Sequence, residues 1–336
     1  MTKTNGADET RDIWFCDDGN TSEVITRRQL PQETRKIVRA LHDLSPGWNW
    51  VILLHLGIWL VCAYIAISVE ILILDLLLYT VAGVSLTTLS GLCHEASHNL
   101  FTRRSSRDAW LGALCGFPIL FSSAGYRVMH RYHHKYLRTK LDPDDPENIT
   151  NHPRLMPFLF IVMMLLGVYL YIVTVPLNAL RHGNGHQRVT IIAELAAMIS
   201  AAVAAWTFIP TPYMLEGWLY PLLIGAQLTN LRGLTEHVLV SRGNEFGDAR
   251  TITTNRWLAS MMCNINYHLE HHLFPGMPWY NLPKVHKALS GMYERTGASV
   301  YPTYRSFYKD FFMAMRQEYV SGRRLVPAHL REHICV

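Results

Sequence analysis

The chain has few charged residues, and this scarcity is the first constraint on its class. Only 17% of its 336 residues are Asp, Glu, Lys or Arg, against 49% hydrophobic residues. Such a balance favours a membrane protein over a soluble domain. The net charge of +5 is modest and dispersed, and it forms no basic, aromatic-interleaved surface of the kind that binds nucleic acid. We therefore expect a membrane-embedded chain without a nucleic-acid partner.

The sequence also lacks a cysteine pattern typical of disulfide-bonded proteins and an apolar signal peptide. The six cysteines are scattered and include no C-x-x-C pair, so we expect reduced thiols that face the cytosol or lie in lipid. The polar start of the chain has no apolar core of the kind that marks a cleaved signal peptide. We expect residues 1–47 to form a cytosolic N-terminal segment and residues 48–336 to form one membrane domain.

Long apolar runs are abundant, and several are long enough to cross the ~30 Å hydrocarbon layer of a membrane. Basic residues stand before the first pair of runs and after it, which predicts a cytosolic location for both ends of that hairpin. We expect a multi-pass protein of the bacterial inner membrane or the endoplasmic reticulum, with both termini and the active site in the cytosol. We expect a mainly α fold with four transmembrane helices in two hairpins, over residues 49–68, 71–93, 189–209 and 213–231.

We expect two further apolar segments to lie along the membrane–water interface or to dip into the membrane without crossing it. They are residues 109–124 and 156–177. The first is short and is interrupted by Gly112, Gly116 and Pro118. The second is assigned by parity: if histidines before and after it share one site, an even number of crossings must separate them. Six crossings are the alternative to four. Residues 232–336 contain no spanning run and are expected to form a helical cytosolic cap.

Histidine is the residue type whose distribution is most informative. Nine of the 17 histidines concentrate in four places, each near the cytosolic end of a predicted span or beside an interfacial segment. Such placement predicts that they converge on one pocket at the membrane surface. The four places hold His94 and His98; His130, His133 and His134; His237; and His268, His271 and His272.

The last cluster is expected on a helix, where positions i, i+3 and i+4 share one face. Asn264 would stand one turn earlier on that face, as a possible metal or water anchor. Nine imidazoles are too many for one ion, whereas two ions with four or five nitrogen ligands each would use them all. Calcium and magnesium prefer oxygen donors, so an all-nitrogen site suits iron and oxygen chemistry better.

Two other classes of protein share parts of this pattern. His94-Glu95-Ala-Ser-His98 is an H-E-x-x-H sequence, which in zinc metalloproteases supplies two ligands and a general base. An intramembrane protease would leave the two H-x-x-H-H clusters without a role. A histidine-lined metal transporter would need its ligands near the bilayer midplane, whereas these histidines lie at the ends of the predicted spans.

Three segments resemble the histidine boxes of the membrane fatty acid desaturase and hydroxylase superfamily in order and spacing. They are His94-Glu-Ala-Ser-His98, His130-Arg-Tyr-His133-His134 and His268-Leu-Glu-His271-His272. The resemblance covers roughly residues 50–290. It implies that His237 is an isolated ninth ligand. We expect acidic side chains to orient the ligand imidazoles; the candidates are Glu95, Glu236, Glu270, Asp142, Asp144 and Asp145.

The resemblance also implies two iron ions (Fe2+/Fe3+) that activate O2 with electrons from a separate protein. That donor would be a ferredoxin or a cytochrome b5, together with its NAD(P)H reductase. No His-Pro-Gly-Gly haem motif occurs, so we expect no fused cytochrome b5 domain. The expected reaction is the introduction of a double bond into a lipid-linked or thioester-linked acyl chain. Hydroxylation, ketolation or oxidative decarboxylation of an alkyl, acyl or terpenoid substrate remain alternatives on the same site.

Overall fold

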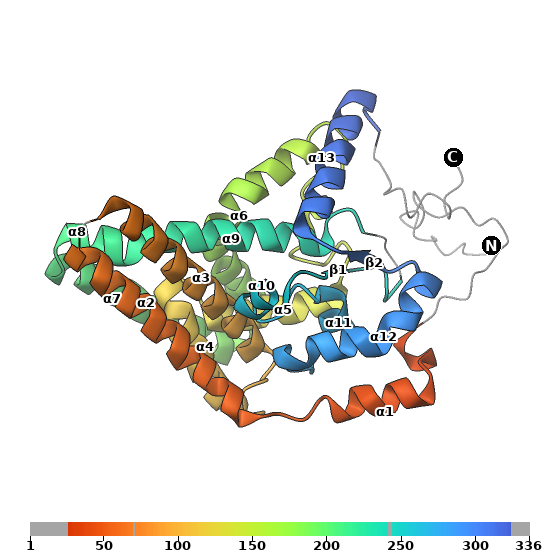
Figure 1. The fold of residues 1–336 in the computed structure, drawn as a ribbon, viewed down its shortest axis with the longest axis horizontal. Helices are drawn as coiled ribbons and strands as arrows, with labels where there is room; N and C mark the ends of the chain where they lie inside the picture. The colour runs from red at the N-terminus through yellow and green to blue at the C-terminus, as the bar shows by residue number, and fades with distance from the viewer. Residues whose placement is uncertain (1–25, 70, 241–243, 324–336) are drawn as a thin grey trace, which may run out of the picture.

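The computed structural model of the chain describes residues 26–69, 71–240 and 244–323. Most of this described chain is helical, with one pair of three-residue strands (Figure 1). The mainly α fold expected from the sequence is therefore confirmed. Residues 1–25 of the predicted N-terminal segment and residues 324–336 of the predicted cap, and with them both chain ends, lie outside the described residues.

Long helices occupy the middle of the chain, and shorter elements follow them. In chain order the helices and strands are α1 (Gln32–Ala40), α2 (Trp50–Val69), α3 (Leu72–Ser97), α4 (Ser105–Gly116), α5 (Ser123–Tyr136), α6 (Met156–His182), α7 (Gly185–Phe208), α8 (Thr211–Met214), α9 (Tyr220–His237), β1 (Arg250–Ile252), α10 (Arg256–Met261), α11 (His268–Leu273), α12 (Leu282–Thr296), β2 (Ser299–Tyr301) and α13 (Tyr304–Ser321).

Four helices of the described chain are long and apolar enough to cross a membrane, namely α2, α3, α6 and α7. They have 20, 26, 27 and 24 residues. At 1.5 Å per residue these lengths match or exceed the ~30 Å of a hydrocarbon core. Large apolar side chains such as Leu72, Ile73 and Phe158 are exposed on them, as expected for surfaces that face lipid.

The number of candidate spans matches the expected four, but their identities differ in one place. Length and composition select α6, which was expected to be interfacial, and do not select the 213–231 segment. That segment is interrupted by a π-helical turn, Leu215–Leu219, and carries the polar residues Gln227, Asn230 and Arg232. By length and composition alone, α6 is therefore a candidate span and the 213–231 segment is not, which is the reverse of the expectation. The predicted domain boundaries stay a prediction.

Helix α3 lies at the centre of the helical layer, with α2 packed on one side and α9 on the other (Figure 1). The backbones of α3 and α9 come so close that a Cβ on Gly225 would stand 2.7 Å from the carbonyl oxygen of Gly83. The hydroxyl of Thr87 donates to the carbonyl of Gly225 across the same contact (3.0 Å). Because the two helices run in the same direction, this contact brings their C-terminal histidines, His94 and His237, to one level.

Helices α4 and α5 form a bent pair, with an angle of 107° between the segments Ser105–Ile119 and Ser123–Tyr136. The bend fits either a broken span or the re-entrant segment expected near residues 109–124. At the corner Leu120 has a left-handed φ of 54°. A Cβ on Gly116 would stand 2.2 Å from the carbonyl oxygen of Phe121, so only glycine fits there.

The cap is joined to the end of α9 by a fully buried arginine, Arg250, in β1. Its guanidinium donates to the carbonyl oxygens of Thr235, Val238 and Leu239 at 2.7–2.9 Å. These carbonyls belong to the last turn of α9 and its exit, where a helix leaves its acceptors unpaired. Burial lowers the pKa of Arg250 to about 10, which leaves it charged at neutral pH. The contact therefore fixes the end of α9 against the cap.

Replacing Gly116 by alanine should destabilise the protein by about 1–3 kcal/mol, the usual cost of forcing an atom into a packed interior. The measurement is the thermal unfolding midpoint of the detergent-solubilised protein. Gly57→Ala is the matched control, because nothing lies within 4 Å of the added Cβ in α2. Equal unfolding midpoints for the two variants would contradict the close approach at the α4–α5 corner.

Candidate metal centre

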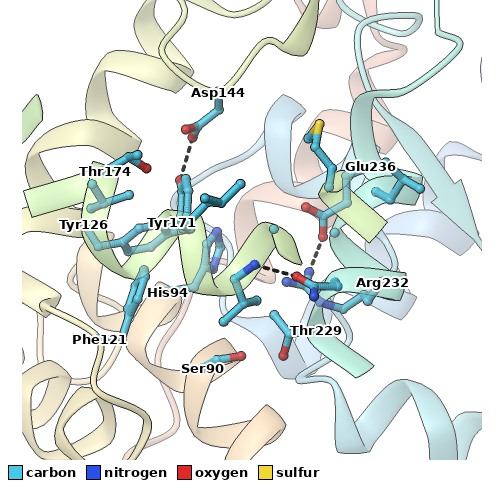
Figure 2. Close-up of a pocket in the computed structure, with 18 of the residues that line it drawn as sticks. Ser90, His94, Phe121, Tyr126, Asp144, Tyr171, Thr174, Thr229, Arg232 and Glu236 are labelled. Carbon is cyan, nitrogen blue, oxygen red and sulfur yellow. Dashed lines mark hydrogen bonds and ion pairs between the residues drawn. The ribbon is translucent and has the colours of Figure 1, made fainter. Parts of the chain in front are cut away.

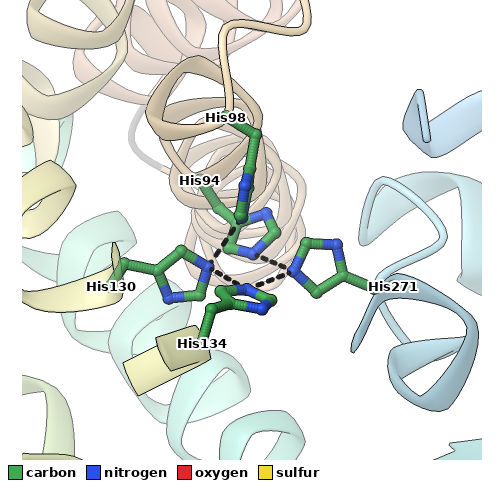
Figure 3. Close-up of side chains that lie close together, drawn as sticks. All are labelled: His94, His98, His130, His134 and His271. Carbon is green, nitrogen blue, oxygen red and sulfur yellow. Dashed lines mark hydrogen bonds between the residues drawn. The ribbon is translucent and has the colours of Figure 1, made fainter. Parts of the chain in front are cut away.

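All nine histidines singled out in the sequence come together, at the C-terminal ends of α3, α5 and α9 and in α11. They form two groups, and within each group the ligand nitrogens lie within 4.8 Å of one another. Figure 3 shows the larger group, in which five imidazoles point toward a common centre. The larger group contains His94, His98, His130, His134 and His271, and the smaller contains His133, His237, His268 and His272.

Each H-x-x-H-H cluster supplies both groups. In α5 the i and i+4 residues, His130 and His134, point to the five-histidine group, while His133 points to the other. In α11 the i and i+4 residues, His268 and His272, point to the four-histidine group, while His271 points to the first. The third residue of each cluster therefore crosses to the neighbouring group. The two histidine-rich helices thus bridge two adjacent centres.

The expectation that Asn264 extends the helical face of the third cluster is wrong. Helix α11 begins at His268, and Asn264 lies in the preceding turn with a left-handed φ of 50°. A short asparagine side chain tolerates this conformation better than most residues do. Its Nδ2 donates to the carbonyl oxygen of Trp279 (3.2 Å). A role for Asn264 as a water anchor stays a prediction.

The imidazole of His237 presents a lone pair to two neighbouring histidines. The Nδ1 atom of His237 lies 3.0 Å from the carbonyl oxygen of Asp248, which only accepts, so Nδ1 carries the hydrogen. The Nε2 atom of His237 therefore offers a lone pair, and it faces the Nε2 of His133 at 3.2 Å and that of His268 at 2.9 Å. His133 donates through its other nitrogen, Nδ1, to a carboxylate oxygen of Asp142 (2.9 Å). Nitrogens that converge in this way suit a metal ion placed among them.

The spacing of the nitrogens indicates which kind of ion fits. Neighbouring Nε2 atoms in the two groups are 2.9–3.2 Å apart. With metal–nitrogen bonds of about 2.1 Å, donors at right angles are about 3.0 Å apart and tetrahedral donors about 3.4 Å. Five donors in one group also exceed the four of a structural zinc site. The donor set therefore fits iron better than zinc.

Burial keeps most of these imidazoles neutral, which is the form that binds a metal. It is the largest cause of a lowered pKa at His98, His130, His134, His268, His271 and His272, and it brings the pKa of His134 to about 2. His133 differs: burial lowers its pKa, but the hydrogen bond to Asp142 and the charge of Asp144 outweigh this and raise it.

The aspartates of the acidic loop after α5 have two different roles. Asp142 orients His133, as described above, and Asp144 lies 3.9 Å from the same Nδ1. Asp145 instead pairs with the buried guanidinium of Arg138 at 3.0 Å. The structure therefore brings Asp142 and Asp144 to a ligand histidine and commits Asp145 to a bridge that stabilises the loop.

The three predicted glutamates lie near the histidines but differ in their contacts. Glu236 has a carboxylate oxygen 3.6 Å from the Nδ1 of His268, and Glu95 has one 3.4 Å from the Nδ1 of His94. Both distances are long for a direct hydrogen bond. Glu270 accepts from three side chains outside the nine histidines, and so holds α11 against β1 and α12 rather than orienting a ligand. Its donors are Thr251, His286 and Tyr293, at 2.5–2.6 Å.

Two residues that support the centre were missed from the sequence. The hydroxyl of Tyr126 lies 3.2 Å from the Nδ1 of His130, four residues later on α5. The carboxylate of Glu194, on α7, accepts from the backbone amides of Ser123 and Ala124 at 3.1 and 2.8 Å. It thereby caps the N-terminus of the helix that carries the second cluster. An acidic residue inside the apolar 189–209 run was the available signal.

A cavity of about 450 Å³ reaches the centre from the side of the long helices. Helices α3, α5, α6 and α9 form its walls, and Figure 2 shows His94 projecting into it. Most of the wall is apolar, with side chains such as Leu86, Phe121, Met163 and Leu222. The described structure therefore joins a buried nitrogen-rich centre to an apolar cavity large enough for part of a long-chain molecule.

The sequence is similar to proteins of one enzyme family. Residues 71–304 match the family model described as fatty acid desaturase. A sphingolipid delta(4)-desaturase/C4-monooxygenase of Homo sapiens is 26% identical over 269 residues, which are 76% of this chain and 78% of the relative. A sphingolipid delta(4)-desaturase of Gallus gallus is 26% identical over 309 residues, 87% and 90% of the two chains. An sn-1 oleoyl-lipid 12-desaturase of Arthrospira platensis is 24% identical over 279 residues, 75% and 79%.

Replacing Asp142 by alanine should weaken metal binding in the four-histidine group about 10–100-fold, because the Nδ1 proton of His133 loses its acceptor. The measurement is the iron retained per chain against a graded series of chelator concentrations. Asp43→Ala, on the exposed surface after α1, is the control. Unchanged retention in Asp142→Ala would show that this carboxylate does not support the centre.

Proposed function

Since the chain belongs to the fatty acid desaturase family, we propose that it is an integral membrane enzyme that uses two iron ions and O2 to introduce a double bond into a lipid-linked chain. Family membership makes it an oxidoreductase that acts in lipid metabolism. The observation that carries the iron assignment is the pair of histidine groups, one of five and one of four imidazoles, in each of which the ligand nitrogens lie within 4.8 Å of one another. Bound iron would supply the oxidising power needed to break an unactivated C–H bond.

The ligands in this proposal are the nine histidines. His94, His98, His130, His134 and His271 would hold one ion, and His133, His237, His268 and His272 would hold the other. The surrounding protein fixes the tautomers of His133 and His237 through Asp142 and the Asp248 carbonyl. The apolar cavity excludes water and aligns an alkyl chain beside the centre.

Hydroxylation is the second candidate, because one relative is named as both a desaturase and a monooxygenase. The two outcomes differ in whether a second hydrogen or an oxygen atom is transferred, and the same centre serves both. A zinc protease has no support. The carboxylate of Glu95, which would be its general base, is 1% exposed and accepts the backbone N–H of Trp279 at 3.0 Å.

Electrons would come from a separate ferredoxin or cytochrome b5 with its NAD(P)H reductase. His98, His134 and His272 are partly exposed and are absent from the cavity wall, so they face away from the substrate side. Arg131 and Lys135 are exposed on α5 beside His134. This outer face is a short route for electrons, and its positive charge suits an acidic donor protein.

For the membrane topology we propose four crossings, by α2, α3, α7 and the α8–α9 segment, with the metal centre in the cytosol. Helix α6 would lie along the interface. Phe160, near its start, packs in one core cluster with Val238, which follows α9. His182, at its end, contacts the ring of Tyr132 in α5 (5.2 Å). Both ends of α6 therefore touch elements that carry ligand histidines, whereas the ends of a crossing helix would lie ~30 Å apart in depth.

Expression in a host of defined lipid content tests the function. The wild-type chain should yield lipids lighter by two hydrogen atoms, or heavier by one oxygen atom if it hydroxylates, and the purified protein should carry two irons. His98→Ala and His272→Ala should each lower bound iron and abolish the product, measured by metal analysis and mass spectrometry. The control is His186→Ala, at an exposed position on α7. Full product formation by both His98→Ala and His272→Ala would refute the site.

Single cysteines test the topology, in a chain with Cys16 and Cys335 replaced by serine. Asn151→Cys and His186→Cys, before and after α6, should both react with a membrane-impermeant maleimide from the cytosolic side. Thr211→Cys, between α7 and α9, should react only from the opposite side. The three positions are exposed. Labelling of Asn151→Cys and His186→Cys from opposite sides would mean that α6 crosses the membrane.

A further inference from the structure

The cavity beside the metal centre has an exposed rim, which is formed by α6 and by the acidic loop between α5 and α6. Among the described residues that line the cavity, the exposed ones are Pro143 and Ile149 in the loop and Leu170 and Thr174 on α6. The other lining residues are buried or half-buried. A cavity opens where its lining is exposed, so these four residues form the mouth of the cavity.

The end of the cavity away from this mouth is closed by buried side chains. Leu86 is 1% exposed, and Ile119 and Leu222 are each 9% exposed. All three belong to one hydrophobic core cluster, in which α3, the α4–α5 corner and α9 pack together. Leu222 precedes the ligand His237 by about four turns of the same helix, or about 22 Å. This blind end is apolar and suits the end of an alkyl chain.

Apolar side chains surround the mouth on its outer side. Leu166, Leu170 and Leu177 are 49–53% exposed, and their spacing places them on one face of α6. In the loop, Ile149 is 72% exposed although it stands between the polar residues Asn148 and Thr150. Exposed apolar surface of this kind marks a contact with lipid or with a partner. In a membrane protein the mouth therefore opens toward lipid rather than toward water.

A hydrogen bond spans the mouth. Tyr171 lies between Leu170 and Thr174 on α6, and its hydroxyl donates to the carboxylate of Asp144 in the loop (2.8 Å). Figure 2 shows the two side chains reaching toward each other. The ring of Tyr171 also stacks on Phe121 in the cavity wall, with 5.9 Å between ring centroids. The Tyr171–Asp144 bond thus joins the two sides of the rim.

The two sides of the rim differ in how firmly they are held. In the loop, the backbone amide of Asp144 donates to the carboxylate of Asp142 (3.0 Å), and Asp145 pairs with the buried guanidinium of Arg138 (3.0 Å). On α6, Pro176 lies inside the helix close to the mouth, and it has no N–H to donate to the preceding turn. The α6 side is therefore the one that gives way when a chain enters.

We propose that the alkyl chain of a membrane lipid enters the cavity through this mouth, and that Tyr171 is a positioning residue. The inference rests on the proposed function, in which the chain lies beside the metal centre. Once the chain is inside, the hydrogen bond from Tyr171 to Asp144 closes the rim around it and slows its exit. The bond thereby holds the chain at the centre and keeps water out.

Photolabelling tests the entrance without requiring turnover. The purified iron-loaded enzyme is placed in phosphatidylcholine vesicles with a long-chain alcohol that carries a diazirine near its methyl end. Light should label peptides that contain Leu86 or Leu222, as mass spectrometry would show. Thr174→Trp narrows the mouth and should lower this labelling several-fold with unchanged bound iron. The same exchange at an exposed position of α7, Thr190→Trp, is the control and should not.

The outcomes of this experiment separate the two proposals. No labelling of the blind end, or equal labelling in Thr174→Trp and Thr190→Trp, would overturn the inference and leave the proposed function intact. If the blind end is labelled through the mouth but the loaded enzyme oxidises no lipid, the proposed reaction fails and the entrance stands.

Spin labels test whether the mouth faces lipid, in a chain with Cys16 and Cys335 replaced by serine. A nitroxide on Ile149→Cys or Leu170→Cys should be more accessible to dissolved O2 than to a water-soluble nickel complex. Asp43→Cys, at an exposed position after α1, is the water-facing reference and should show the opposite order. Greater nickel access at either rim position would mean that the mouth faces water, which would overturn entry from the membrane.

Tyr171→Phe tests the role of the hydrogen bond, because it keeps the ring and removes the hydroxyl. The long-chain alcohol should dissociate several-fold faster, and KM for the lipid substrate should rise while kcat and bound iron stay nearly unchanged. Tyr169→Phe is the control, on the same helix but outside the cavity lining. An unchanged dissociation rate, or a loss of bound iron, in Tyr171→Phe would contradict the positioning role.

Discussion

The structure depends on nine imidazoles that are crowded together with their lone pairs facing inward. Without a cation this arrangement is unfavourable, because neighbouring Nε2 atoms lie only 2.9–3.2 Å apart. Asp142 and the Asp248 carbonyl hold the Nδ1 atoms of His133 and His237, so that their Nε2 atoms face the centre. Burial adds to the constraint, since it disfavours the protonated form that would otherwise supply the positive charge. Folding and metal binding would therefore be coupled in the proposed enzyme, and the packing of the protein holds the nitrogens in place.

Contacts between several elements outside the centre hold the histidines in place. The contact of Gly83 with Gly225 sets α3 and α9 in register, and Arg250 fixes the end of α9 against the cap. Glu194 does the same for α5 by capping its first turn. The first contact joins two elements that carry ligands, and the other two join such an element to one that carries none. The positions of the histidines are thus secured by the packing of the whole helical layer.

The cavity relates this centre to chemistry on lipids. Its lining is mostly apolar, which suits an alkyl chain, and it includes His94, His130, His133, His237 and His268. Family membership accounts for a lipid substrate without selecting one, because the relatives include enzymes named for sphingolipids and for oleoyl lipids.

The sequence by itself determined the class of the protein and all nine histidines. Apolar runs are dictated by the thickness of a bilayer, and metal ligands by the chemistry of their side chains, so both are visible in the order of residues. It also indicated Asp142, because an acidic loop follows the second histidine cluster. The prediction for Asn264 was wrong because it extended the helical spacing of the third histidine cluster one turn too far. Asn264 lies in the turn before the helix.

Only the tertiary structure decided how the histidines divide into two groups. His133 and His134 are adjacent in sequence, but they serve different centres because successive helical residues point about 100° apart. The support from Tyr126, Glu194 and Arg250 likewise depends on contacts between distant segments, which leave no periodic trace in the chain. The cavity has the same origin, because α3, α5, α6 and α9 enclose it only after they pack together.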